Sequence, residues 1–404
     1  MPQPQDPILI AGAGPVGVLT ALALARAGLE VEVFEALDDV ITSPRAATTH
    51  PATLEMIADL GLIDDYIARG LVARMFQFWD RPSGRKICEF DHDVLKGDTR
   101  FPFVVQTEQH KLAYMAIDRL RALGAAVHFG TRIDAVQLLD GGVRVTIDGP
   151  RGSRAVSGSY LVGADGGRST VRKALGIEFE GYTFPERFLV LTTPYDFAAE
   201  RGYCFRNYIA DPEAWTNLFK VAGDDGSGLW RAVFPTLPGE SDEEVLSDAA
   251  VQERMQRFFP KAGPYDIVHR NLYNVHQRVA ATFRKGRAFL AGDAAHVNNP
   301  IGGLGLNCGI HDAMELAPLL AAVCRGEAAP ATLDRYDRRR RPINVEFVQQ
   351  QTIANKKRLE ERDPAVREAN FETLRKTAAD PAAHRAFLLR TSLLESVRKA
   401  KTIY

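Results

Sequence analysis

The 404-residue sequence predicts an α/β protein: a Rossmann-like dinucleotide-binding domain is interrupted by a mainly antiparallel sheet and followed by a helical C-terminal segment. Three observations lead to this prediction. The chain opens with a strand, a glycine-rich turn and a helix within Ile8–Ala27. Two later apolar runs, Leu161–Gly163 and Ala288–Ala291, end in Gly/Asp turns, as buried parallel strands do. Between these runs, residues 187–236 are rich in aromatic and β-branched residues, which favour an antiparallel sheet.

The first half of the chain alternates strand and helix signals. The uncharged run Ile8–Ala11 is typical of a buried strand, and Val16–Ala27 carries Ala and Leu at helical spacing and ends at Gly28. The following elements are expected in this order: a strand at Glu30–Glu35, a helix over 52–69, a hairpin over 72–104 around Arg81–Gly84, a helix over 108–123 and two strands over 125–148 with a turn at Asp140. The first strand, the helix at Val16–Ala27 and the strand at Glu30–Glu35 form a βαβ unit.

The second half contains the sheet and the helices. Turn residues at Asp211-Pro212 and Gly223–Gly228 divide the sheet over 187–236 into strands. A helix is expected over 243–260, and the pattern is helical from about residue 305 onward. We therefore expect a discontinuous nucleotide-binding domain over 1–72, 103–176 and 277–330, a substrate domain over 73–102 and 177–276, and C-terminal helices over 331–404.

Composition excludes several classes of protein. A net charge of −1 gives no electrostatic reason to expect nucleic acid as a partner. The four cysteines, Cys88, Cys204, Cys308 and Cys324, show no CxxC pair or metal-ligand spacing, so neither a disulfide framework nor a metal site is expected. No run of about 18 apolar residues could span a membrane, and the N-terminus lacks a signal-peptide pattern. The cytoplasm is therefore the expected location, and the protein is expected to be a monomer or a homodimer.

The strongest local motif is Gly12-Ala-Gly14-Pro15-Val16-Gly17, placed between a strand and a helix. The first glycine permits a tight turn, the second lets the backbone approach a pyrophosphate, and the third allows close helix packing. The helix N-terminus then directs N–H groups at the phosphates. Glu35, with Ala36 beside it, ends the second strand, where a carboxylate would bind the ribose hydroxyls. The motif predicts a dinucleotide but does not distinguish FAD from NAD.

Five ordered motifs identify the family that the chain resembles. They are Gly12–Gly17, Arg45-Ala46, Val105-Gln106, Gly163-Ala-Asp165-Gly166 through Arg172, and Gly286 through Asp293 with the following stretch Asn299-Pro300-Ile-Gly302-Gly303-Leu-Gly305-Leu306-Asn307. Over about residues 1–340 the chain resembles the class A FAD-dependent aromatic hydroxylases, the para-hydroxybenzoate hydroxylase-like flavoprotein monooxygenases. The resemblance implies a non-covalent FAD in a domain of the GR2 type.

The resemblance also implies roles for these residues. Asp293 would accept hydrogen bonds from the ribityl hydroxyls, Gln106 would approach the ribityl chain, and Arg45 would lie near the phosphates. Asp165 would lie near both FAD and the nicotinamide nucleotide. Gly303 and Gly305 would allow close approach to the flavin ring. The N–H groups of Leu306 and Asn307, at a helix start, would stabilise the anionic reduced flavin.

The implied reaction is hydroxylation of a small phenolic or N-heteroaromatic substrate through a C4a-hydroperoxyflavin, with NADH or NADPH as transient reductant and O2 as co-substrate. Pro300 matches the family proline whose carbonyl lies beside the substrate, and His50 is a second catalytic candidate. Asn299 stands where the family usually has a second proline, which leaves room for a polar ring. Candidate substrate contacts from the inserted sheet are Tyr203, Arg206, Tyr208, Phe219 and Arg231.

Two alternatives remain open at this stage. A halogenase or reductase shares the FAD domain, although the isolated Trp79, Trp215 and Trp230 do not form the halogenase motif. A catalytically silent FAD-binding regulator belongs to another class, and it would show no substrate-dependent NAD(P)H oxidation.

Overall fold

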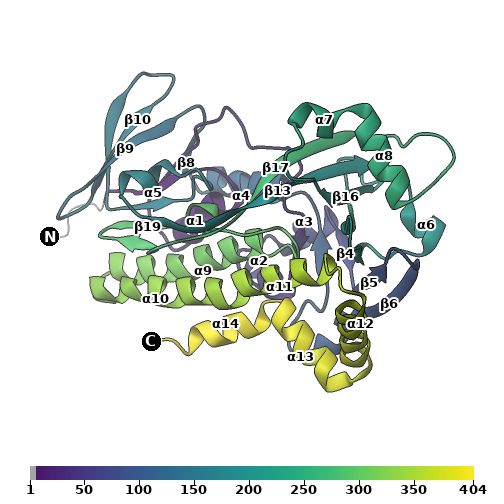
Figure 1. Cartoon of the computed structure of the whole chain (residues 1–404). Coiled ribbons are helices and arrows are strands. Elements are labelled where there is room, and N and C mark those ends of the chain that lie inside the picture. The colour runs from purple at the N-terminus through teal and green to yellow at the C-terminus, as the bar shows by residue number, and fades with distance from the viewer. Residues whose placement is uncertain (1–5) are drawn as a thin grey trace.

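The apolar run Ile8–Ala11 forms strand β1 at the centre of a six-stranded sheet, and all four of its residues are buried. The computed structural model describes residues 6–404. β1 pairs in parallel with β2 and β12, and the sheet order is β18-β19-β12-β1-β2-β8. Its strands are β1 (Ile8–Ala11), β2 (Val31–Phe34), β8 (Ala126–His128), β12 (Tyr160–Gly163), β18 (Arg284–Lys285) and β19 (Ala288–Leu290). Helix α1 (Pro15–Arg26) packs against α4 (Gln109–Ala122) and α9 (Gly305–Cys324) beside this sheet (Figure 1).

A second, eight-stranded sheet has the order β20-β17-β13-β16-β15-β14-β5-β6. Neighbouring strands are antiparallel except for β14 and β5, which run parallel. The strands are β5 (Met75–Asp80), β6 (Arg85–Asp91), β13 (Phe179–Thr193), β14 (Arg206–Ala210), β15 (Thr216–Val221), β16 (Leu229–Pro235), β17 (His269–Ala280) and β20 (His296–Val297). The expected antiparallel sheet is confirmed, with turns at Asp211-Pro212 and within Gly223–Gly228.

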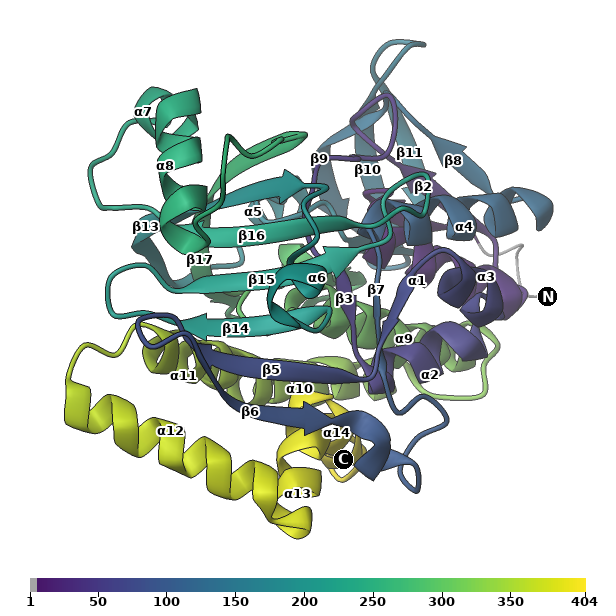
Figure 2. The same cartoon turned by 90° about the vertical axis from the view of Figure 1, so that its right-hand side faces the viewer.

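The two faces of this sheet pack on different partners because side chains alternate along each strand. Trp79, Ile209 and Trp230 face the cluster completed by α6 (Phe197–Arg201) and α8 (Asp248–Phe258). Phe78 and Tyr208, one residue away in each strand, face the cluster that includes Leu388 of the C-terminal helices. Figure 2 shows α7 (Asp242–Leu246) and α8 on one side of the strands, with the C-terminal helices along the β5–β6 edge. The face that carries Tyr208 is thus the one enclosed by the chain's last helices.

Two smaller sheets and several short helices complete this part of the fold. One three-stranded sheet consists of β3 (Thr48–Thr49), β4 (Leu71–Ala73) and β7 (Val104–Gln106), and another of β9 (Arg132–Leu138), β10 (Val143–Asp148) and β11 (Arg154–Gly158). The helices here are α2 (Pro51–Asp59), α3 (Ile63–Ala68) and α5 (Thr170–Ala174), with short 3-10 turns η1 (His92–Leu95), η2 (Gly292–Ala294) and η3 (Pro330–Leu333).

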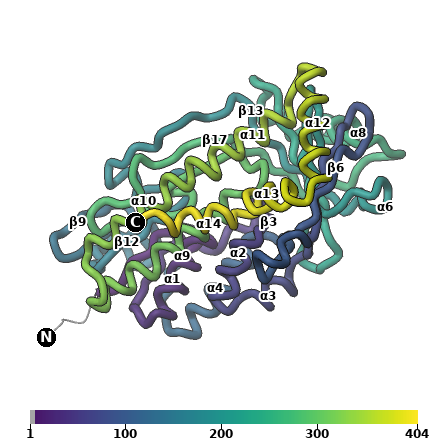
Figure 3. Tube along the Cα trace, turned by 90° about the horizontal axis from the view of Figure 1, so that it is seen from below, coloured from purple at the N-terminus to yellow at the C-terminus, as the bar shows by residue number. Residues whose placement is uncertain are grey.

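The C-terminal segment is helical, as expected, and lies across the underside of the molecule (Figure 3). It comprises α10 (Asp334–Ile343), a π-helical turn η4 (Asn344–Gln349), α11 (Gln350–Leu359), α12 (Pro364–Ala379), α13 (Pro381–Thr391) and α14 (Leu394–Lys401). Within residues 6–404, no helix is long and apolar enough to cross a bilayer.

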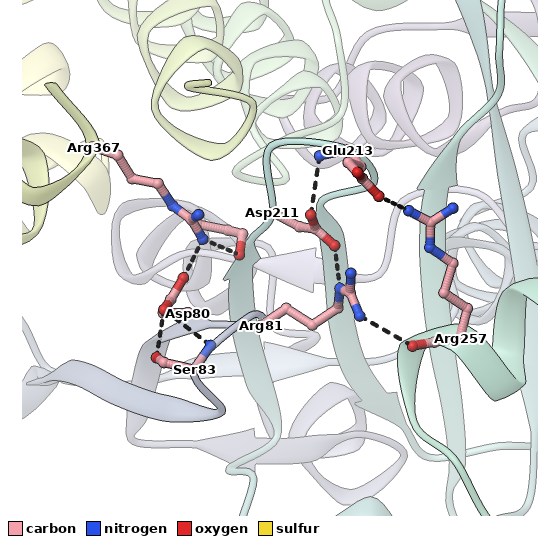
Figure 4. Close-up of polar contacts among 8 residues, drawn as sticks. Asp80, Arg81, Ser83, Asp211, Glu213, Arg257 and Arg367 are labelled. Atoms are coloured by element: carbon pink, nitrogen blue, oxygen red, sulfur yellow. Dashed lines mark hydrogen bonds and ion pairs between the residues drawn. The ribbon is translucent and has the colours of Figure 1, made fainter. Parts of the chain in front are cut away.

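One ion pair and one hydrogen bond fasten α12 to the rim of the eight-stranded sheet. Arg367 of α12 contacts the carboxylate of Asp80, at the end of β5, and donates to the carbonyl of Ala210 at 3.2 Å (Figure 4). In the same view Arg81 contacts Asp211, in the turn after β14. Helix α12 is therefore held against the ends of β5 and β14, which are far from it in the sequence.

Several sequence expectations about individual elements are wrong in detail. The helix over 52–69 is two helices, because Gly61 lies between them at φ +71°. The helix over 243–260 is also two, since Ser247 has an extended backbone and caps α8. Residues 125–148 form three strands, β8, β9 and β10, where two were expected, and β3, β11, β17, β18 and β20 were not anticipated. The hairpin over 72–104 is shorter than expected: β5 and β6 form it, while β4 and β7 belong to another sheet.

Candidate functional site

The glycine loop between β1 and α1 has the geometry of a phosphate-binding turn. Gly12 lies at φ +101°, and a Cβ there would stand 2.5 Å from the carbonyl oxygen of Ala164. A Cβ on Gly17 would stand 2.0 Å from the carbonyl oxygen of Gly12. A Cβ on Gly14, in contrast, would meet no protein atom within 4 Å. Gly12 and Gly17 thus serve packing, whereas Gly14 presents bare backbone at the start of α1, where a pyrophosphate could approach.

Pro15 and Val16 complete this turn. Pro15 occupies the first helical position, where a missing N–H costs nothing. Val16 is buried, and its side chain lies where a Cβ on Gly292 or Gly309 would stand, at 3.0 Å and 2.5 Å. The glycine loop, the Gly292-Asp293 turn and α9 therefore meet around Val16.

Glu35 is fixed beside the glycine loop. Its Oε2 accepts a hydrogen bond from the Ala13 N–H at 2.7 Å, and its Oε1 accepts one from the Leu37 N–H at 3.0 Å. The next residue, Ala36, is exposed. The carboxylate is thus held at the end of β2, within reach of the turn where a ribose would follow the pyrophosphate.

Asp293 follows Gly292, which lies at φ +60°, at the end of β19. Its side chain is exposed to solvent, yet the surrounding protein raises the pKa of the carboxyl by desolvation, while His296 and Arg45 oppose the rise. Asp293 and Arg45 are therefore brought to the same region.

Asp165 has a structural role that its motif did not reveal. Its carboxylate accepts hydrogen bonds from the Thr170 N–H at 2.7 Å and the Ser169 hydroxyl at 2.5 Å, and so caps helix α5. Arg172, on that helix, donates to the carbonyls of Gly167 and Ala294, both at 2.8 Å. Arg172 is buried, so it is a bridge between two motif loops and not a surface charge.

The loop before α9 is built from left-handed glycines. Gly302 lies at φ +113° and Gly303 at φ +66°, and α9 then begins at Gly305. The N–H groups of Gly305, Leu306 and Asn307 lie in the first helical turn, so they have no intrahelical acceptor. They are free to face an anionic or electron-rich ligand at the positive end of the 20-residue helix.

Two amide side chains fasten this loop to the rest of the site. Asn307 donates to the carbonyls of Thr48 at 2.8 Å and Gly303 at 2.6 Å, and it accepts from the His50 N–H at 2.8 Å. Gln106 accepts from the Thr48 hydroxyl at 2.6 Å. The structure thus brings His50, Gln106 and Asn307 together around β3, and the side chains of Gln106 and Asn307 are occupied by protein partners.

His50 is buried and lies against the same loop. Its Nε2 is 2.8 Å from the carbonyl oxygen of Gly302, and its Nδ1 has no hydrogen-bond partner within residues 6–404. Burial, reinforced by the charge of Arg206, holds the pKa of His50 well below its usual value. The ring is therefore neutral, with Nε2 as donor to Gly302 and Nδ1 as an unused acceptor.

An aromatic pocket lies between the eight-stranded sheet, the loop before α9 and the C-terminal helices. Arg206 and Tyr208 of β14 form one wall with Phe78 of β5, whose ring stacks on Tyr208 at 5.1 Å. The residues that line the pocket are Phe76, Phe78, Arg206, Tyr208, Gly302, Leu304, Gln351, Asn355, Leu359, Phe387 and Thr391. Pro300 does not line it, and its carbonyl accepts from the Gly303 N–H at 2.9 Å.

The other predicted substrate contacts lie elsewhere. Phe219 and Arg231 follow Arg206 in register across β15 and β16, so they share its face of the sheet. Arg231 is buried, 3.7 Å from Glu108. Tyr203 packs edge-on against Trp79, at 4.8 Å between centroids, in the cluster that α8 covers. It is on the opposite side of the sheet and does not line the pocket.

Sequence reasoning missed most of the lining. Phe76 and Phe78 alternate in one strand, a signal that could have been paired with Arg206 and Tyr208 in β14. The residues from α11 and α13 carried no such signal. The polarity of Asn299 was misinterpreted: Asn299 is buried, its N–H donates to Gln277 and its side-chain oxygen accepts from the Ile301 N–H. It therefore says nothing about the substrate.

Comparisons with known proteins agree with this geometry. A model of the FAD binding domain matches residues 5–351. Para-nitrophenol 4-monooxygenase from Pseudomonas sp. (strain WBC-3) is 36% identical over 392 residues, which are 95% of this chain and 94% of that protein. 6-Hydroxy-3-succinoylpyridine 3-monooxygenase HspB from Pseudomonas putida (strain DSM 28022 / S16) is 34% identical over 362 residues, 88% of this chain and 90% of that one.

The same relationship is seen in solved structures. The crystal structure of p-nitrophenol 4-monooxygenase PnpA from Pseudomonas putida DLL-E4 matches with a TM-score of 0.91 and 34% identity, covering 97% of this chain and 98% of that one. Within residues 6–404, no group of three or more His, Cys, Asp or Glu side chains is placed to hold a metal ion. The chain belongs to the FAD-binding-domain family of flavoprotein monooxygenases that includes the para-hydroxybenzoate hydroxylase-like aromatic hydroxylases, and it is an FAD-dependent enzyme.

Proposed function

We propose that this enzyme hydroxylates a small phenolic or N-heteroaromatic compound, with FAD as its cofactor and NADH or NADPH and O2 as co-substrates. One observation carries the proposal: Gly302 and Leu304 belong both to the aromatic pocket and to the loop that leads into α9. The pocket and the proposed flavin site therefore share a wall. The names of the two relatives, a nitrophenol and a hydroxypyridine monooxygenase, support these two substrate classes.

The residues of the site fit FAD. Gly14 offers open backbone to the pyrophosphate, Glu35 is placed for the ribose, and Asp293 presents an accessible carboxylate for the ribityl hydroxyls. Leu306 and Asn307 offer N–H groups at the start of α9. When bound, FAD supplies the redox and oxygen-transfer chemistry. The remaining cofactor contacts that we propose are Gly12, Pro15, Val16, Gly17, Ala36, Arg45, Gln106, Asp165, Gly303 and Gly305.

The protein's own tasks are to orient the ring and exclude water. Phe78 and Tyr208 would contact a flat substrate ring on one wall of the pocket, and Phe387 of α13 contributes another part of the lining. Exclusion of water matters because a wet site would release H2O2 in place of hydroxylated product. His50 is proposed to act by positioning: its Nε2 holds the Gly302 carbonyl, and Gly302 lines the pocket. Pro300, Phe219 and Arg231 remain proposed contacts of a larger substrate.

The decisive experiment measures NAD(P)H consumption by the FAD-loaded enzyme with a panel of phenols, aromatic acids and hydroxypyridines. The expected result is stimulation by at least one compound, with a product heavier by one oxygen atom. A halogenated product would favour a halogenase instead, and no stimulation by any aromatic would favour a silent FAD-binding regulator. Asp293→Ala should abolish both FAD retention and turnover.

The wider organisation is also a proposal. We infer a discontinuous FAD-binding domain over 1–72, 103–176 and 277–330, a substrate domain over 73–102 and 177–276, and C-terminal helices over 331–404. The six-stranded and eight-stranded sheets support this division, although β17 runs past residue 276. The cytoplasm, a monomer or homodimer, and no nucleic-acid partner are likewise proposed, as the composition suggests.

A further inference from the structure

A buried carboxylate joins the two loops that are proposed to hold the flavin. Asp312 lies in α9 and is completely buried. Its Oδ2 accepts a hydrogen bond from the Gly292 N–H at 3.0 Å and lies 2.6 Å from Nε2 of His296. Its Oδ1 accepts from Nε of Arg340, in α10, at 2.7 Å. One side chain of α9 therefore binds the turn after β19, strand β20 and helix α10.

The carboxylate of Asp312 is ionised inside the protein. Burial alone would raise the pKa of this carboxyl, but His296 and Arg340 outweigh burial and hold the pKa below its usual value. His296 is 1% exposed and Arg340 is 2% exposed. The network is therefore a buried ion pair with a histidine attached, and each oxygen of the carboxylate has at least one partner.

Stability does not explain a buried ion pair of this kind. Taking two charges out of water costs about as much as their attraction returns, so apolar side chains of similar volume would serve a core equally well. A fully bonded polar network provides something else, which is one defined arrangement of the segments that carry it. We therefore ask which segments Asp312 holds in register.

The segments that Asp312 holds carry two proposed flavin contacts. Gly292 lies at φ +60° directly before Asp293, whose exposed carboxylate is proposed for the ribityl hydroxyls. Helix α9 begins at Gly305, and the N–H groups of its first turn are proposed to face the flavin ring. The turn and the helix are in contact, since a Cβ on Gly309 would stand 3.0 Å from the Cα of Gly292.

Arg340 provides a second hold on the start of α9. Helices α9 and α10 lie side by side (Figure 1). Nη2 of Arg340 donates to the carbonyl of Cys308 at 3.2 Å, within the first four residues of α9. The first turn of α9 is thus fixed from α10, and the turn that presents Asp293 is fixed from α9.

We propose that Asp312 is a positioning residue for FAD, because it sets the carboxylate of Asp293 relative to the N-terminus of α9. His296 and Arg340 hold Asp312 in the orientation that this task requires. Asp312 is completely buried, so it acts through these two segments and does not touch the cofactor. The inference goes beyond the proposed function, but it rests on the cofactor contacts proposed above for Asp293 and α9.

The test compares the affinity of the apoprotein for two ligands, FAD and ADP, by calorimetry. ADP contains the adenosine and the pyrophosphate of FAD but lacks the ribityl chain and the ring. A general disturbance of the dinucleotide fold should weaken both ligands, whereas a displaced Asp293 or α9 should weaken FAD alone. Urea unfolding of each apoprotein measures its stability separately.

Asp312→Asn keeps the size of the side chain and removes its charge. We expect FAD to bind about 10- to 100-fold more weakly, as the loss of charge-assisted hydrogen bonds implies, while the affinity for ADP changes by less than about twofold. Asp211→Asn is the matched control. Asp211 is 1% exposed and also pairs with an arginine, Arg81, but it lies at the rim of the eight-stranded sheet, so its replacement should weaken neither ligand.

A double-variant cycle tests the route through Asp293. Asp293→Asn should itself weaken FAD binding, because it removes the charge proposed to face the ribityl hydroxyls. If Asp312 acts through Asp293, the effects of Asp293→Asn and Asp312→Asn on FAD affinity should be less than additive.

Arg340→Lys tests the second arm of the network. It keeps the positive charge but lacks the planar fork that reaches both Asp312 and the Cys308 carbonyl. FAD affinity should fall about 3- to 10-fold, again without loss of ADP affinity. This variant decides the question if Asp312→Asn does not fold.

Three results would overturn the inference: wild-type FAD affinity of Asp312→Asn, or of Arg340→Lys where it stands in; an equal loss of FAD and ADP affinity; or fully additive effects in the cycle with Asp293→Asn. These binding measurements require no substrate. If they give the expected results and no aromatic compound stimulates NAD(P)H consumption, the proposed function fails and the inference stands.

Discussion

Substitution of Gly14 by valine should remove FAD binding without unfolding the protein. Gly14 has an ordinary extended backbone, with φ −63° and ψ 169°, which valine adopts readily. A Cβ at this position meets no protein atom within 4 Å. The apoprotein should therefore lose no more than about 1 kcal/mol of unfolding free energy, the scale of a changed helix N-cap.

The loss of FAD affinity should be much larger. The valine side chain would occupy the surface by which the pyrophosphate reaches the N–H groups of α1. Loss of one or two charge-assisted hydrogen bonds costs about 2–4 kcal/mol, which corresponds to about 30- to 1000-fold weaker binding. Flavin fluorescence quenching measures the affinity, and urea unfolding of the apoprotein, followed by circular dichroism, measures the stability.

Gly17→Ala is the matched control. Its Cβ would stand 2.0 Å from the backbone oxygen of Gly12, so the apoprotein itself should be destabilised by about 1–3 kcal/mol. The reasoning is refuted if Gly14→Val keeps wild-type FAD affinity. It is equally refuted if Gly14→Val destabilises the apoprotein as much as Gly17→Ala does.

Three further predictions concern packing, pH and the pocket. Gly309→Ala should lower the free energy of unfolding by about 1–3 kcal/mol, because the added Cβ would stand 2.5 Å from the Val16 side chain. Val16→Ala should restore part of this loss in the double variant. Additive effects of the two substitutions in urea unfolding would contradict this. His92 stays neutral when folded, with its pKa lowered to about 4, so the unfolded chain binds its proton first as pH falls below about 6.5. As the pH falls from 6.5 to 4, His92 should therefore lower the free energy of unfolding by up to about 1.4 kcal/mol per pH unit. Urea unfolding of His92→Gln at a series of pH values should show a smaller dependence of stability on pH. Tyr208→Phe should raise the substrate KM about 2- to 10-fold, since Arg206 loses its hydroxyl partner, whereas Tyr203→Phe, on the other side of the sheet, should not change it; equal effects in steady-state assays would show that the sheet face was assigned wrongly.

The cofactor motifs could be predicted from the sequence because their requirements are local. Gly12 needs a positive φ and no Cβ, and no other residue type satisfies both demands. The strand before it and the helix after it carry their own apolar patterns. The order of these local signals was therefore sufficient to place the family and the fold.

The substrate pocket could be predicted only in part. Arg206 and Tyr208 were predicted because they lie in the inserted sheet, but nothing local distinguishes their face of the sheet from the side on which Tyr203 lies. Thr391 joins the pocket from α13. A helical pattern shows which face of a helix is apolar, but not which sheet it will meet, so this contribution depends on tertiary packing alone.

The position of α13 late in the chain determines when the substrate pocket can form during synthesis. All motifs of the flavin loops have been synthesised once residue 307 is added, whereas the pocket lacks one wall until α13 is complete at Thr391. A nascent chain therefore acquires its cofactor surface before it can shelter a substrate. Because the pocket wall and the cofactor loops come from different segments, each can change in evolution independently of the other. Substitutions in α11 and α13 can change the shape of the substrate pocket. They do not affect the cofactor loops, where only glycine fits at certain positions.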